Sequence, residues 1–187
     1  MQSIVLRDMI EEKTVKMVID HLRIYDEIWD WVYKTLHFRP NGRDMGHDYP
    51  FGPPFRIPFA YQVHGIENMS DAQLDIIDTL VKQALCNAAA EGQRLFVLDW
   101  QHSGFLIDPK SIGEQYSFWA EDPRFSEGGY HAYYPGFYPD GDYYFFIDEH
   151  LQFGYLSHPW REEVWIFGDA LLNEFEQIYH QLGWYKL

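Results

Sequence analysis

Residues 143–167 have the sequence YYFFIDEHLQFGYLSHPWREEVWIF, and this stretch decides the fold. Three apolar runs, at residues 143–147, 151–156 and 164–167, are separated by short polar segments, and each run has the length of a strand. Connections this short join neighbouring antiparallel strands, because a parallel pair needs a long crossover. We therefore expect a three-stranded antiparallel meander.

More strands are expected on the N-terminal side of this meander. Residues 95–100 and 104–107 are short apolar runs with a polar turn between them, a pattern that predicts a hairpin. Residues 57–64 are predicted to form a further short strand. Pro58 favours an edge position for this strand, because proline donates no ladder hydrogen bond. Together the runs predict a largely antiparallel sheet.

Helices are expected beside the sheet. Ser70 and Gln73 form a capping-box pattern ahead of a long apolar stripe. Asp169 is the expected N-cap of a C-terminal helix with a similar stripe. Residues 24–36 have apolar positions at spacings of three and four, which predicts an amphipathic helix that buries Trp31.

The order of helices and hairpins predicts one α+β domain over residues 1–187, with a largely antiparallel sheet packed against three or four helices. The length of 187 residues suits a single core, and a hydrophobic fraction of 47% excludes a disordered chain. Residues 1–22 have a looser apolar pattern, which is compatible with an N-terminal helical extension of the domain.

The chain is strongly acidic. It has 29 acidic and 14 basic residues and a net charge of -15, and residues 95–187 alone hold 15 acidic and 4 basic residues. Such a charge repels phosphates, which argues against nucleic acid as a ligand, and it speeds the encounter with a basic protein. The alternative interpretation is a solubilising surface.

The same sequence argues against a membrane partner. No apolar run approaches the roughly 20 residues that cross a bilayer. Residues 1–10 include Arg7 and Asp8 where a signal peptide would have an apolar core, so we expect a cytoplasmic protein. A single cysteine, Cys86, excludes an internal disulfide.

Three strings place polar side chains at the ends of predicted strands: LDWQH at residues 98–102, PDGDYY at 139–144 and FGYLSHPW at 153–160. Strand ends converge in space if the sheet is compact, and the sequence leaves open whether these strings meet in one pocket. Their Asp and His side chains could hydrogen-bond turn backbone, or they could form one surface for a partner. A third interpretation is a divalent metal site with the ligands Asp99, His102, Asp142 and His158.

No known catalytic string supports the metal interpretation. The sequence lacks the H-E-x-x-H, C-x-x-C, G-x-S-x-G and phosphate-loop patterns. The spacing of the four candidate ligands matches no known metal motif. We therefore expect no catalytic residue and no cofactor, and an enzyme is kept as the alternative.

Aromatic side chains are the other functional candidate. The chain has 14 Phe, 14 Tyr and 7 Trp, many of them in a predicted long loop over residues 109–139. They could pack onto the sheet, or they could form an exposed aromatic and acidic surface that anchors a basic partner. The partner-binding residues predicted by this second interpretation are Asp99, Trp100, His102, Tyr133, Tyr134, Tyr138, Asp140, Asp142, His158, Trp160, Glu162 and Glu163.

The three strings, together with WIFG at residues 165–168, resemble an uncharacterised bacterial family of unknown function. The resemblance covers residues 25–175. It implies a bacterial origin and a shared fold, and no activity comes with it. A more distant analogy, in overall character alone, is to the immunity proteins that neutralise secreted bacterial toxins, including the SUKH group.

Three functions remain open on these observations. The main hypothesis is a cytoplasmic, non-enzymatic binding protein, specifically an immunity-type inhibitor that occludes a basic toxin domain. The second is a metal-assisted hydrolase that acts on a small substrate. The third is a regulatory or structural homodimer that buries the aromatic loop against its own copy.

Overall fold

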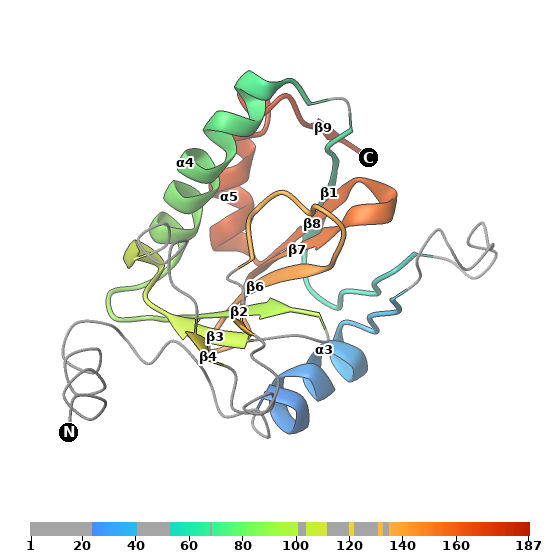
Figure 1. Ribbon diagram of the computed structural model, residues 1–187, viewed down its shortest axis with the longest axis vertical. Helices are drawn as coiled ribbons and strands as arrows, with labels where there is room; N and C mark the ends of the chain where they lie inside the picture. Colours follow the sequence, from blue (N-terminus) through green and yellow to red (C-terminus); the bar gives the residue numbers. More distant parts are fainter. Residues whose placement is uncertain are drawn as a thin grey trace.

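In the described part of the chain, an antiparallel sheet of seven strands forms the centre of the fold (Figure 1). The computed structural model describes residues 24–40, 53–67, 69–100, 104–111, 120–121, 131–132 and 135–187. All neighbouring strands in this sheet pair in antiparallel fashion. From one edge to the other the strands are β3 (Gly104–Ile107), β2 (Leu95–Asp99), β6 (Tyr144–Asp148), β7 (Gly154–His158), β8 (Glu163–Phe167), β1 (Tyr61–Gly65) and β9 (Tyr185–Lys186).

The expected meander is confirmed as strands β6, β7 and β8, and the expected hairpin as β2 and β3. Strand β7 begins at Gly154 instead of residue 151, because the buried Asp148 carboxylate holds the preceding turn. Its Oδ1 accepts the backbone N–H of Phe153 at 2.7 Å, and its Oδ2 accepts that of His150 at 3.0 Å. These bonds occupy backbone groups that the strand ladder would otherwise use.

Helices α4 and α5 cover one face of the sheet (Figure 1). Helix α4 (Asp71–Ala88) begins at the expected capping box of Ser70 and Gln73, in which each side chain accepts the other's backbone N–H. The predicted Asp169 cap of α5 (Asp169–Ile178) is wrong, because Gly168 occupies the N-cap and no side-chain cap hydrogen bond forms. Gly168 has a φ of 88°, which lets the chain turn directly from β8 into the helix.

The opposite face is covered by η1 (Ile24–Trp29), α3 (Asp30–Thr35) and the segment that includes Phe55. Because both faces are covered, the central strands are apolar on both sides. The prediction named the wrong buried tryptophan, since Trp29 is 3% exposed and Trp31 is half-buried. Trp29 lies on the same helix face as Val32 and Leu36, which follow it by three and seven residues and are also buried. The expected α+β fold class is confirmed.

Two other expectations differ from the structure or lie outside it. Strand β1 lies between β8 and β9, with Pro58 ahead of it, so its edge placement is wrong. The expected helical extension over residues 1–22 lies outside the described residues. Among the helices that the structure describes, none is long and apolar enough to cross a bilayer. The predicted long loop includes the short elements η3 (Pro109–Ser111), β4 (Ala120–Glu121) and β5 (His131–Ala132).

Candidate functional site

The structure brings described residues of all three polar strings together at one end of the sheet, a point that the sequence left open. The strand register sets Asp99 of β2 opposite Tyr144 of β6, and His158 of β7 opposite Glu163 of β8. Ser157 bonds the backbone of Tyr144 twice: its Oγ accepts the N–H at 3.1 Å and donates to the C=O at 2.9 Å. We call the end of the sheet formed by these five residues the motif end.

Tyr144 is surrounded by carboxylates at the motif end. Its phenol donates a hydrogen bond to Oδ1 of Asp140 at 2.5 Å. Burial, this hydrogen bond and the negative charges of Asp140, Asp99 and Asp142 raise its pKa well above the ordinary value of tyrosine. The phenol therefore keeps its proton and orients the Asp140 carboxylate.

His158 is fully buried and serves the fold. Its Nδ1 accepts the backbone N–H of Arg161 at 3.3 Å and so caps the turn η5 (Pro159–Arg161). Its ring packs edge-on against Tyr143, with 4.8 Å between the ring centroids. Burial and the positive charge of Arg161 lower the pKa of His158 to about 3, so the imidazole is neutral at physiological pH. It lies inside the core, with none of its surface exposed.

Glu163 is also an interior group, with 6% of its surface exposed. Nε and a terminal guanidinium nitrogen of Arg161 each bond one of its carboxylate oxygens at 2.8 Å. Nε1 of Trp165 donates a further hydrogen bond at 3.0 Å. The pairing compensates the charge of Arg161. Of the predicted partner-binding residues, Asp99, His158 and Glu163 are thus buried.

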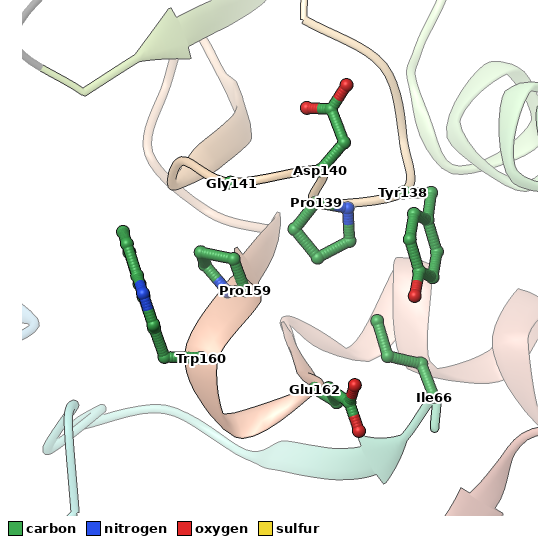
Figure 2. A pocket seen from close by; sticks show the side chains of 8 residues that line it. All are labelled: Ile66, Tyr138, Pro139, Asp140, Gly141, Pro159, Trp160 and Glu162. Carbon is green, nitrogen blue, oxygen red and sulfur yellow. The ribbon is translucent and has the colours of Figure 1, made fainter. Parts of the chain in front are cut away.

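A pocket with a volume of about 300 Å³ opens beside the motif end. Figure 2 shows the rings of Trp160 and Tyr138 on opposite sides of it, with Pro139 and Pro159 between them. Two of the three strings contribute to its wall. The complete lining consists of Ile66, Tyr138, Pro139, Asp140, Gly141, Pro159, Trp160 and Glu162.

Two carboxylates, those of Asp140 and Glu162, flank this pocket. Among the described residues, neither Asp140 nor Glu162 forms an ion pair. Glu162 has a left-handed backbone, with a φ of 52°, which is uncommon for a residue other than glycine. Its N–H donates to the C=O of Pro159 at 3.2 Å, and its C=O accepts the N–H of Ile66 at 2.8 Å. The backbone therefore fixes the direction in which the Glu162 side chain leaves the chain.

The remaining predicted residues are outside the pocket lining or outside the described part of the chain. Trp100 packs on the α3 side of the sheet, where its Nε1 donates to the hydroxyl of Tyr33 at 2.8 Å. Oδ1 of Asp142 accepts the backbone N–H of Tyr143 at 2.7 Å. The structure does not describe His102, Tyr133 and Tyr134.

Sequence reasoning missed half of the pocket lining, namely Ile66, Pro139, Gly141 and Pro159. Small and apolar residues carry no local sign that they border a cavity. Three of the four ligands in the metal interpretation, Asp99, Asp142 and His158, fall in the described residues. Within those residues, no group of three or more His, Cys, Asp or Glu is placed to hold a metal ion.

The family model described as "Protein of unknown function (DUF2716)" matches residues 22–172. The chain belongs to this family. "Uncharacterized protein YxiI" of Bacillus subtilis (strain 168) is 29% identical over 153 residues, which are 81% of this chain and 86% of that protein. No solved structure matches the chain. The resemblance to an uncharacterised bacterial family is confirmed, and both the motif end and the pocket lie within the DUF2716 match.

Proposed function

We propose that the protein is a non-enzymatic binding protein that takes a basic protein partner at the motif end and its pocket. The observation that carries this proposal is that one pocket combines two aromatic rings with two carboxylates that form no ion pair among the described residues. Asp140 and Glu162 supply the charges, and Tyr138 and Trp160 supply the rings. Aromatic anchors beside charged rim groups are typical of selective protein interfaces.

The charge distribution favours a basic partner. The whole chain has a net charge of -15, and Asp99 and Asp142 add negative charge around Tyr144. Arg161, which lies beside the motif end, is paired with Glu163. A positively charged protein is steered toward such a surface, whereas a negatively charged one is repelled.

The specific form that we propose is a cytoplasmic, immunity-type inhibitor that occludes a basic toxin domain. An inhibitor of this kind needs a complementary surface and no reacting group of its own. Two described polar side chains of the motif end that a catalyst could have used are engaged in the fold. Ser157 bonds the backbone of Tyr144, and His158 caps a turn.

The test is affinity capture from the native cell at low salt, compared across matched variants. The pocket variant carries Asp140→Asn and Glu162→Gln, which remove both flanking charges. The control variant carries Asp75→Asn and Glu91→Gln, which remove the same charge at exposed positions outside the pocket lining. We expect one basic protein in stoichiometric amount with the wild type and the control, and its loss with the pocket variant.

The association rate with that purified protein gives a second readout. Exposed charges act over about 10 Å at 0.1 M salt, so the rate should fall steeply as salt is raised, and less steeply for the pocket variant. A partner without excess positive charge, or one retained equally by both variants, would contradict the proposal. A small molecule that copurifies in place of any protein would contradict it as well.

A further inference from the structure

The pocket is small and chemically mixed. Its volume of about 300 Å³ lies at the lower end of the range for ligand pockets, roughly 300–1,000 Å³. The rings of Tyr138 and Trp160 and two prolines offer flat apolar surfaces, and Glu162 adds a carboxylate (Figure 2). Such a space suits one long amino-acid side chain that has an apolar stem and a charged tip.

The walls of the pocket are held in place by the fold. The Trp160 ring packs on the buried Tyr143 ring, with 5.1 Å between the centroids. Glu162 is held by backbone hydrogen bonds to Pro159 and Ile66. Because little backbone freedom remains to be lost, a side chain that enters the pocket meets a surface that is already formed.

The charges of the pocket decide which charged end group of a side chain fits into it. Asp140 and Glu162 lack a counter-ion among the described residues, so an anion is repelled and a cation is attracted. A lysine ammonium is a strongly hydrated point charge, and aromatic walls replace little of its hydration. A guanidinium is flat and more weakly hydrated, stacks on aromatic rings and bonds a carboxylate through two N–H groups.

We infer that the pocket binds a single arginine side chain of the basic partner, and this inference rests on the proposed function. The aliphatic stem of the arginine lies against Pro139 and Pro159. Its guanidinium stacks on Trp160 and donates hydrogen bonds to Glu162, while Asp140 adds negative charge from the other side of the prolines. The partner must therefore present an arginine that projects from its surface.

The test uses the full chain, labelled with nitrogen-15, and three capped tripeptides with glycine on both sides of arginine, lysine or citrulline. The indole N–H resonance of Trp160, assigned from its loss in Trp160→Phe, reports on the pocket. We expect the arginine peptide to shift this resonance saturably and the lysine peptide to bind at least about fivefold more weakly. Citrulline has nearly the same shape without the charge, so it should cause no saturable shift.

Variants connect the signal to the pocket carboxylate. Glu162→Gln keeps the size of the side chain and removes its charge, so the arginine peptide should bind roughly tenfold more weakly. The control Glu91→Gln should leave the affinity unchanged, since Glu91 is exposed outside the pocket lining. Equal affinities for arginine and lysine, a saturable citrulline shift, an unaffected Glu162→Gln or no shift at all would overturn the inference.

Failure of this inference is distinguishable from failure of the proposed function. If the partner makes its contact through lysine or through several charges, the peptides fail while the capture experiment still yields a basic protein that the pocket variant loses. If the arginine peptide binds and no basic protein is captured, the proposed function fails and the arginine pocket stands.

Discussion

Mild acid should weaken the fold through one buried histidine, His64 of strand β1. This side chain is 1% exposed, and its Nδ1 has no hydrogen-bond partner among the described residues. Burial and the positive charge of Lys186 lower the pKa of His64 to about 4, and the negative charge of Glu176 opposes them. The imidazole packs among the rings of Phe175, Tyr179 and Trp184.

The direction of the effect follows from the two protonation equilibria. His64 titrates at about 6.5 in the unfolded chain and at about 4 in the fold, so between these values the unfolded chain binds an extra proton. The free energy of unfolding therefore falls as the pH is lowered through this window. At about 1.4 kcal/mol for each pH unit, the contribution reaches roughly 3 kcal/mol once the pH is below about 4.

The perturbation is His64→Leu, which removes the titrating group and the unpaired Nδ1 at similar volume. Urea unfolding, followed by tryptophan fluorescence, is compared at about pH 7.5 and about pH 5.5, above the isoelectric point of about 4.8. From the higher to the lower pH, the free energy of unfolding should fall by about 1.4 kcal/mol more in the wild type than in His64→Leu. The control variant is His150→Gln, which replaces an exposed histidine and should behave as the wild type. Equal losses in the wild type and His64→Leu would refute the reasoning.

Three further changes test the packing that positions the motif end. Gly154→Ala places a Cβ 2.5 Å from the ring of Phe167, so we expect the free energy of unfolding, measured by thermal unfolding, to fall by about 1–3 kcal/mol. An unchanged melting temperature would contradict the contact. Asp148→Ala leaves the buried N–H of Phe153 without its acceptor and should lower the free energy of unfolding in urea by about 3 kcal/mol, a loss that Asp148→Asn should partly restore. Ser70→Ala removes the capping box and should lower the free energy of unfolding by about 1 kcal/mol. Amide hydrogen exchange should become faster in the first turn of α4 alone, and exchange at the wild-type rate would argue against the cap.

Elements that depend on neighbouring residues were predicted well. The capping box of Ser70 and Gln73 involves residues three apart, and the meander needs only short turns between apolar runs. Elements that depend on distant contacts were predicted poorly. The burial of Trp29 in place of Trp31, and the placement of β1 beside β9, result from packing against other parts of the chain.

The candidate site shows the same division. The sequence placed Asp99, Asp140 and His158 at strand ends, and the structure brings their strings together at one end of the sheet. The sequence did not indicate that His158 and Glu163 are buried while Glu162 is exposed. Exposure is decided by which elements cover a strand end, and that is a property of the folded chain.

By itself the sequence determines the acidity of the chain, the aromatic content and the polar strings, because each of these is a property of composition or of residues close together in the chain. Only the tertiary structure decides that one pocket is lined by Ile66, residues 138–141, Pro159, Trp160 and Glu162. The physical reason is the sheet register, which aligns the end of β1 with the start of β8 and the end of β7. Residues far apart in the chain thereby come into contact, and their carboxylates and rings act together.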